Sequence, residues 1–376
     1  MKKEKIKKLQ GIYAIAVPGI TLGVLSIILW FSKPDEISVS ERRKLAQFPS
    51  FGISQILDGS FMKGMESYSQ DQFPFRDSLR RLKSNVLFNL YRQKDVHGIY
   101  VADGYAASIM KEINEGAVRH SLLAFNNVYE KYIKDGEHQI YMGIVPDKGY
   151  YLAEANGYPS MDYEAFFKRF EDEMPYASFI DLTKTLTIDS YYRTDSHWKQ
   201  ECLKDTADAI RKAMNLNIVN NESETVKKAS DEFYGVYYGQ AALPMKPDEI
   251  SYIDSDVIAN ASVFNFETGK TGGVYDWDKL SGYDPYDFFL SGSAPLLTIE
   301  NSDAETKRQL IVFRDSYAGS LLPLLVKDYS KIVAIDIRYI YPDSLDEFID
   351  FESLKGADVL YLYGTILLND SSTLKR

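Results

Sequence analysis

Residues 309–317, Gln309-Leu-Ile-Val-Phe-Arg-Asp-Ser-Tyr317, decide the fold, because a short apolar run ends abruptly in polar residues. Segments of two kinds surround it: strand-like runs at 139–145, 331–336 and 358–363, and helix-like runs at 319–328 and 345–354. The run at 139–145 is apolar throughout and stops at Pro146, which is typical of a strand buried on both faces. Strands alternating with helices predict βαβ units, and hence an α/β fold with a central parallel sheet flanked by helices.

Composition limits the classes of protein to consider. The 376 residues are 45% hydrophobic and 26% charged, which is ordinary for a folded chain with a substantial core. The net charge is −11 although residues 1–10 are basic, so the rest of the chain is acidic and we expect no nucleic acid partner. The single Cys202 excludes an intramolecular disulfide. No metal-ligand spacing or glycine-rich nucleotide motif is present in the sequence, and we expect neither a metal nor a cofactor.

Residues 11–31 are uncharged and mostly apolar. As a helix they would span about 31 Å, which matches the hydrocarbon core of a bilayer. Five Lys residues precede the run, so the positive-inside rule places residues 1–10 in the cytoplasm and the body outside. A cleaved signal peptide is the alternative, but its apolar region is shorter and is followed by small residues. We therefore expect 11–31 to be a single transmembrane anchor.

The rest of the chain divides by composition. Residues 32–60 are polar and contain Pro34, Pro49, Gly52 and Gly59, which is typical of a tether. Residues 61–376 are expected to form one catalytic domain. Within it, residues 215–300 are rich in Asn, Ser, Asp and Gly, and are expected to be an insertion of small strands and loops over the sheet.

His197 differs from the other histidines in its neighbours, Asp195-Ser-His-Trp198. An Asp two residues before a His can bind one ring nitrogen, fix the tautomer and leave the other nitrogen as a general base. By itself the pattern is weak, because it occurs often by chance and a lone His is usually structural. His97, His120 and His138 are expected to have structural or surface roles.

Ser316 follows a predicted strand and precedes a predicted helix. The carboxyl edge of a parallel sheet is where ligands bind in open α/β folds. The helix N-terminus would offer free N–H groups to a developing oxyanion. A helix N-cap is the alternative role for this Ser.

Taken together, Asp195-Ser-His-Trp198 and Arg314-Asp-Ser-Tyr317 resemble the DHHW family, relatives of the alginate O-acetyltransferase (AlgJ/AlgX-like) proteins of the SGNH-hydrolase-like type. Further passages fit in the family's order: residues 40–49, 68–76, 145–148, 335–338 and 361–365. The resemblance implies a circularly permuted SGNH-like domain in which Asp195, His197 and Ser316 form a catalytic triad. Two positions depart from the family pattern. Ser196 replaces the His that names the family, and Gly364-Thr-Ile366 lies where an oxyanion-hole Asn would be expected.

The resemblance also implies a function. It predicts a membrane-anchored, extracytoplasmic O-acetyltransferase that modifies a cell-surface or exopolysaccharide, with the polysaccharide as acyl acceptor. Because acetyl-CoA is cytoplasmic, a membrane-bound O-acyltransferase is expected as the partner that supplies the acyl group. A carbohydrate acetyl esterase would use the same acyl-enzyme with water as acceptor. A non-catalytic polysaccharide-binding or assembly subunit is the third possibility.

Four more residues are candidates for substrate binding: Lys148, Trp198, Arg314 and Arg338. Lys148 could reach the edge of the site or lie on the surface. Trp198 could stack on a sugar ring or be buried beside His197. The two Arg residues could bind an anionic sugar, or simply pair with Asp315 and Asp336.

Overall fold

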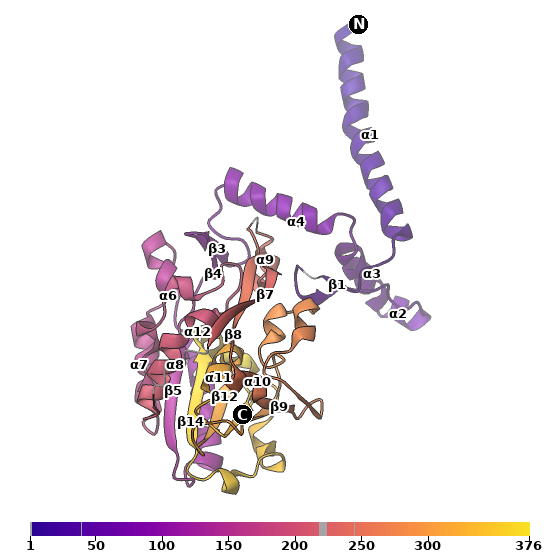
Figure 1. The fold of residues 1–376 in the computed structure, drawn as a ribbon. Coiled ribbons are helices and arrows are strands. Elements are labelled where there is room, and N and C mark those ends of the chain that lie inside the picture. The colour runs from indigo at the N-terminus through magenta and orange to yellow at the C-terminus, as the bar shows by residue number, and fades with distance from the viewer. Residues whose placement is uncertain (1, 39, 218–223, 244) are drawn as a thin grey trace. The chain divides into compact units, whose positions relative to one another are not determined.

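The computed structural model describes residues 2–38, 40–217, 224–243 and 245–376. It separates into two units. The N-terminal unit runs to Gln93 and includes a short piece at 242–243, and the C-terminal unit holds the remaining described residues from Lys94 onward. Figure 1 shows the elements of both units.

The N-terminal unit begins with the long helix α1 (Lys2–Phe31), which contains Pro18. Its part Gln10–Phe31 has the length and apolar character needed to cross a membrane. The remaining elements are short: β1 (Ile37–Ser38), β2 (Arg43–Lys44), α2 (Ile53–Leu57), α3 (Ser60–Asp71), α4 (Arg76–Asn85) and the π-helix η1 (Val86–Leu90).

The C-terminal unit is built on an eight-stranded sheet with the order β10-β9-β11-β13-β12-β14-β5-β6. The five strands that run parallel are β5 (Gln139–Val145), β6 (Ser178–Ile180), β12 (Gln309–Arg314), β13 (Lys331–Ile335) and β14 (Asp358–Gly364). The predicted α/β fold with a central, mostly parallel sheet is confirmed.

The antiparallel edge of the sheet departs from the sequence prediction. It consists of β11 (Leu296–Glu300), β9 (Ser262–Asn265) and β10 (Lys270–Gly272). Three strands from residues 215–300 therefore extend the sheet instead of lying over it. They do so because an open sheet edge leaves backbone groups unpaired until another strand covers them. The other pairs of strands are separate ribbons: β3 (Ile99–Ala102) with β4 (Tyr105–Ser108), and β7 (Thr225–Phe233) with β8 (Asp248–Asp254).

Helices cover both faces of the sheet (Figure 1). Alternate residues of β12 divide between the two cores, because successive side chains of a strand point to opposite faces. Leu310 and Val312 pack in the core that includes α8 (Lys204–Ala213) and α11 (Ala318–Leu325). Ile311 and Phe313 pack in the core that includes α5 (Glu115–Val128) and α7 (Tyr163–Glu173). Further short elements include η2 (Tyr129–Ile133), α6 (Gly149–Leu152), α9 (Val236–Ala241), α10 (Asp256–Asn260), η7 (Trp277–Ser281), η8 (Pro285–Phe288) and α12 (Thr365–Asn369).

Candidate active site

Ser316, His197 and Asp195 form a continuous chain of hydrogen bonds. The distance from His197 Nε2 to Ser316 Oγ is 2.7 Å, and that from His197 Nδ1 to Asp195 Oδ1 is 2.6 Å. Because a carboxylate can only accept, Nδ1–H donates to Asp195, and Nε2 is left to accept from the Ser316 hydroxyl. Asp195 is fully buried, His197 is 8% exposed and Ser316 is half-buried. The nucleophile candidate can therefore be reached from solvent, while the carboxylate behind the imidazole cannot.

The end of β12 positions Ser316. Asp315, the first residue after the strand, accepts from the backbone N–H of Tyr317 at 3.0 Å and from that of Gly364 at 2.7 Å. These two bonds tie the Ser316 turn to the end of the neighbouring strand β14. A Cβ on Gly364 would lie 2.6 Å from the Tyr317 ring, so this close approach requires glycine. Burial raises the pKa of the Asp315 carboxyl.

The backbone N–H of Ser316 has no recorded hydrogen-bond partner among the residues that the structure describes. It lies just before α11. A free N–H at this position can donate to an oxyanion that forms on a carbonyl carbon attacked by Ser316.

The loop that carries Asp195 and His197 is held from residues 233–248. Asp195 Oδ2 accepts from the backbone N–H of Val236 at 2.8 Å, and Oδ1 also accepts from that of His197 at 3.0 Å. Gly235 approaches so closely that a Cβ there would lie 2.3 Å from the backbone N of Asp195 and from two backbone atoms of Thr194. The carboxylate is thus fixed by backbone groups on both sides.

Asp248, at the start of β8, anchors the same loop just before Asp195. Its carboxylate accepts from the backbone N–H groups of Arg193 and Thr194 at 2.9 and 2.8 Å, and from the Thr194 hydroxyl at 2.6 Å. Thr194 Oγ1 in turn accepts from the backbone N–H of Gly235 at 2.9 Å. This network joins the Asp195 loop to β8 and to the turn before α9.

Tyr286, in η8, lies flat against the imidazole of His197. Their ring centroids are 3.9 Å apart and the rings are within 11° of parallel. The Tyr286 hydroxyl shares a hydrogen bond of 2.8 Å with Ser320 Oγ in α11. Stacking against a ring that is fixed at its far end limits the imidazole to one orientation.

Lys148 is buried beneath the Asp195 loop, and its ammonium donates to the backbone carbonyls of Tyr192 and Arg193 at 2.9 and 3.2 Å. Burial lowers the pKa of Lys148 to about 7. Trp198 is also fully buried, and its Nε1–H donates to the Tyr317 carbonyl at 3.0 Å. Both side chains are occupied inside the protein, so we no longer expect either to contact a substrate.

The two arginines differ. Arg314 is fully buried and donates to the Gly292 carbonyl at 3.1 Å, which withdraws it from substrate contact. Arg338 forms a two-pronged ion pair with Asp336, with N–O distances of 2.9 and 2.6 Å, and lies over the Tyr339 ring. The alternative of pairing with Asp336 is therefore what the structure shows for Arg338.

Positions 364–366, where the family pattern leads to an Asn, serve packing and backbone contacts. Gly364 donates to Asp315 as above, and the Thr365 hydroxyl donates to the buried Asp147 carboxylate at 2.7 Å. Asp147 also accepts from the Tyr163 hydroxyl at 2.8 Å. These bonds join the end of β14 to the end of β5.

Sequence reasoning missed Gly235, Val236, Asp248 and Tyr286, all from residues 215–300. None lies in a periodic apolar pattern, and a single Gly, Asp or Tyr in a polar segment gives no local signal. Two of the other histidines make ordinary contacts, since His120 Nε2 and His138 Nδ1 each lie 2.8 Å from a backbone carbonyl oxygen. Within the described ranges, no three His, Cys, Asp or Glu side chains are grouped as a metal site would require.

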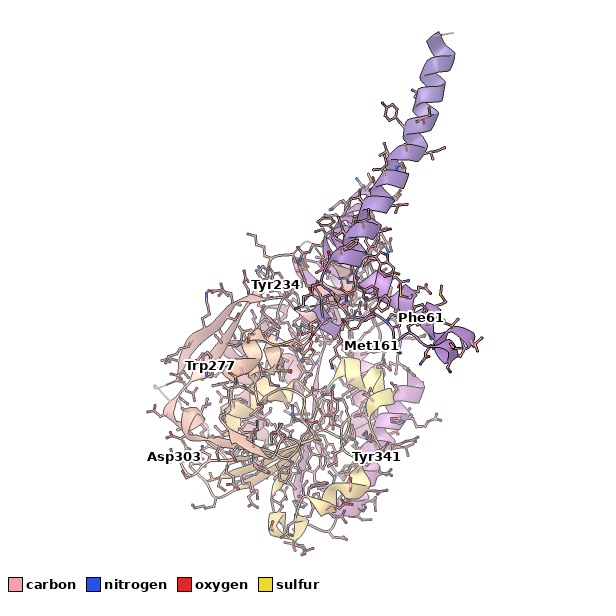
Figure 2. The ribbon with its side chains drawn as sticks, turned by 90° about the vertical axis from the view of Figure 1, so that its right-hand side faces the viewer. Phe61, Met161, Tyr234, Trp277, Asp303 and Tyr341 are labelled. Carbon is pink, nitrogen blue, oxygen red and sulfur yellow. The ribbon has the colours of Figure 1, made fainter. Side chains whose placement is uncertain are left out.

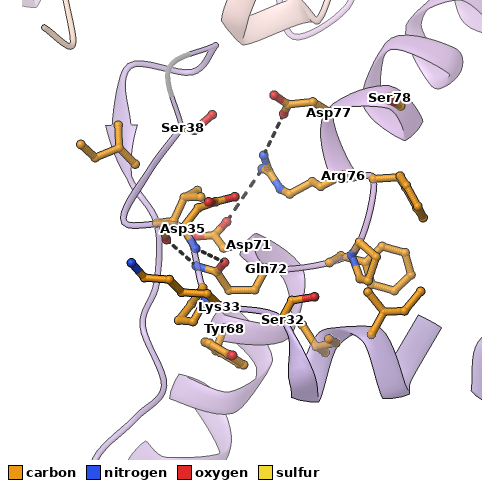
Figure 3. A pocket seen from close by; sticks show the side chains of 18 of the residues that line it. Ser32, Lys33, Asp35, Ser38, Tyr68, Asp71, Gln72, Arg76, Asp77 and Ser78 are labelled. Atoms are coloured by element: carbon orange, nitrogen blue, oxygen red, sulfur yellow. Dashed lines mark hydrogen bonds and ion pairs between the residues drawn. The ribbon is translucent and has the colours of Figure 1, made fainter. Parts of the chain in front are cut away.

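A separate pocket of about 610 Å³ lies in the N-terminal unit (Figure 3). Its wall carries polar contacts between Gln72 and the backbone of Asp35, and ion pairs from Arg76 to Asp71 and Asp77. None of the triad candidates lines it.

Several solved structures share the fold of the chain. A DHHW family protein from Eubacterium siraeum aligns with a TM-score of 0.58 and 18% identity, over 75% of this chain and 97% of its own. The chain shares the fold of this DHHW family protein. Bacillus cereus PatB1, in a structure with a sulfonyl adduct, aligns with a TM-score of 0.58 and 16% identity, over 72% of this chain and 95% of its own. The O-acetyltransferase domain of Pseudomonas putida AlgJ is more distant, at a TM-score of 0.43 and 14% identity, over 72% and 92% of the two chains. No protein-family model matches the chain, and no curated protein sequence does.

Proposed function

We propose that the chain is an O-acyltransferase that moves an acetyl group to a hydroxyl of a polysaccharide through Ser316, His197 and Asp195. The observation that carries the proposal is the unbroken chain of hydrogen bonds from Ser316 Oγ through the imidazole to a buried carboxylate. The shared fold with the DHHW family protein supports it.

The first half-reaction forms an acyl-enzyme. As Ser316 Oγ attacks the carbonyl carbon of an acyl donor, His197 Nε2 takes the hydroxyl proton and becomes an imidazolium. Asp195 stabilises that charge through Nδ1–H, and the Ser316 N–H donates to the oxyanion of the tetrahedral intermediate. The intermediate collapses, the bond to the leaving group breaks, and His197 returns the proton to that group.

The second half-reaction transfers the acyl group. A sugar hydroxyl attacks the acyl carbonyl while His197 Nε2 takes its proton, and the Ser316 oxygen leaves and is reprotonated by the same nitrogen. Water in place of the sugar would give an esterase by the same steps. The two activities therefore differ only in the acceptor.

The proposed location is the outer face of a membrane. Helix α1 supplies an apolar segment of suitable length, Gln10–Phe31. The Lys residues that precede this segment in the sequence favour a cytoplasmic N-terminus. An enzyme facing outward needs an acyl supply, so the proposed partner is a membrane-bound O-acyltransferase. Protease added to intact cells should then degrade the body of the protein. Protection of the body until the cells are lysed would contradict this topology.

The function is tested with an artificial acyl ester, with and without an oligosaccharide acceptor. We expect ester turnover to rise with acceptor and to yield acylated sugar. We expect Ser316→Ala to lower the turnover by more than about a thousandfold, because the nucleophile is lost. Ser344→Ala, a serine on the same unit that is half-buried like Ser316, is the matched control and should behave as wild type. Ester turnover that does not change with acceptor would favour the esterase. Equal turnover in wild type and Ser316→Ala would reject both the transferase and the esterase.

A further inference from the structure

A second pocket of about 610 Å³ lies in the C-terminal unit, at the antiparallel edge of the central sheet. Its wall is made by β10, the outermost strand, by the turn that joins β9 to β10, by η7, and by Ser291 and Ser293. None of the triad candidates lines this pocket, so it is a distinct site.

Trp277, labelled in Figure 2, is the dominant aromatic group of the pocket, and the residue is 54% exposed. Its ring is held by edge contacts with Tyr252 and Phe288, at centroid distances of 5.6 and 5.1 Å and interplanar angles of 89° and 74°. Both partners are buried in one aromatic cluster. An indole that is exposed yet braced in this way is a rigid platform whose position does not depend on a ligand.

Polar groups surround the platform. The pocket contains three carboxylates and two ammonium groups: Glu267, Asp276 and Asp278 with Lys270 and Lys279. None of these five charged groups forms an ion pair within the part of the chain that the structure describes. Asp276 accepts a hydrogen bond from Ser291 Oγ at 2.7 Å. A Cβ on Gly272 would meet nothing within 4 Å, so ligand atoms can approach the backbone there.

An exposed aromatic face with carboxylate, amide and hydroxyl groups at its rim matches a sugar ring. The C–H face of a pyranose packs on the indole, and the hydroxyls around the ring bond to the polar rim. A slight excess of carboxylates disfavours an anionic sugar, since like charges at short range repel. We infer that this pocket binds a neutral saccharide unit of the acceptor polysaccharide.

The pocket and the triad candidates share one structural element. Phe288 contacts Trp277, and Tyr286, two residues earlier in η8, stacks on His197. Phe289 touches both Phe288 and Tyr286, with centroid distances of 5.2 and 5.3 Å. A polymer held at Trp277 would therefore be fixed relative to His197 through packed side chains. The acceptor role rests on the proposed function, whereas saccharide binding itself does not.

Binding is tested on the full chain in detergent micelles, in the Ser316→Ala background so that no acyl chemistry takes part. The probes are tetramers of a neutral hexose, of an N-acetylhexosamine and of a uronic acid, with affinity measured by calorimetry. We expect a neutral tetramer to bind more tightly than the uronate. Trp277→Ala should weaken that binding by about tenfold, which corresponds to about 1.4 kcal/mol. Trp277→Phe should keep most of it, because a ring face remains.

Tyr341→Ala is the matched control, since Tyr341 is 60% exposed, lies on another side of the same unit (Figure 2) and is outside the pocket. It should bind as the parent does. Intrinsic fluorescence gives an independent readout, because Trp198 is fully buried and Trp30 ends the membrane helix. A saturable spectral change with the neutral tetramer should disappear in Trp277→Phe.

The failures of the two proposals are distinguishable. If neither neutral tetramer binds, if the uronate binds more tightly, or if Trp277→Ala binds like its parent, the inference is overturned whatever the ester assay gives. If neutral saccharide binds at Trp277 but wild-type ester turnover does not depend on Ser316, the proposed function fails and the saccharide site stands. If the proposed function and the saccharide site are both correct, Trp277→Ala should raise the KM for the acceptor more than it changes kcat.

Discussion

Gly235→Ala tests whether the backbone contact behind Asp195 sets the geometry of the proposed triad. The added Cβ would lie 2.3 Å from the N of Asp195 and from the C and O of Thr194. Ordinary contacts of this kind are about 3.5 Å, so one of the two segments must move by about 1 Å. All the atoms involved belong to the backbone, so no side-chain rotation can relieve the overlap.

The expected loss follows from that displacement. A shift of about 1 Å in a group that orients the catalytic base costs about 100-fold in rate. Overpacking of this kind costs about 1–3 kcal/mol of stability. We therefore expect kcat for the artificial acyl ester to fall about 100-fold at a temperature where the variant, by urea unfolding, is still folded.

Two comparisons make the Gly235 result decisive. Gly116→Ala is the control, because a Cβ at Gly116 in α5 would make only an ordinary contact of 3.4 Å. In an Asp195→Asn background, Gly235→Ala should add little further loss, since both changes act through the same carboxylate. Full activity of a folded Gly235→Ala would refute this reasoning. So would a double variant whose loss of kcat equals the product of the losses of Gly235→Ala and Asp195→Asn.

Further predictions concern the groups around His197 and its loop. Tyr286→Leu should lower kcat about tenfold, because the stacked ring that orients His197 is lost, whereas Tyr286→Phe should retain most of the activity; equal kcat in both variants would contradict this. Asp248→Ala should lower kcat and cost about 1–3 kcal/mol in urea unfolding, because two backbone N–H groups and a hydroxyl lose their acceptor. Lys148 has a pKa of about 7 when folded and about 10.4 when unfolded, so between those pH values the unfolded chain binds a proton that the folded chain lacks. The stability of wild type relative to Lys148→Met should therefore rise from pH 7 to pH 10, and a constant or falling difference in urea unfolding would count against it.

The parallel strands of the sheet could be predicted because each has a recognisable apolar pattern within its own residues. Residues 309–313 are apolar at every position after Gln309, as a strand with cores on both faces must be, and the structure divides Val312 and Phe313 between those cores. The same run placed Ser316 at the carboxyl edge of the sheet. The antiparallel strands β9 and β10 were missed because they are short and partly exposed. They form strands only by pairing, β9 with β11 and β10 with β9.

The supporting groups of the site could not be predicted, because their roles arise from contacts between distant segments. Asp248 lies some fifty residues from the loop that it holds, and Tyr286 reaches His197 only because η8 packs beside α11. The burial of two charged residues was also not predicted. Lys148 and Arg314 are charged, which favours exposure in a sequence pattern, but inside the fold both donate hydrogen bonds to backbone carbonyls.

Covalent trapping shows whether Ser316 is the nucleophile. The full chain is treated with an aryl sulfonyl fluoride, which transfers its sulfonyl group to an activated serine with loss of fluoride, and the adduct is located by peptide mass spectrometry. We expect one sulfonyl group per chain, on the peptide that contains Ser316, with labelling abolished in Ser316→Ala and strongly slowed in His197→Ala. Labelling at another residue, or equal labelling of wild type and Ser316→Ala, would contradict it.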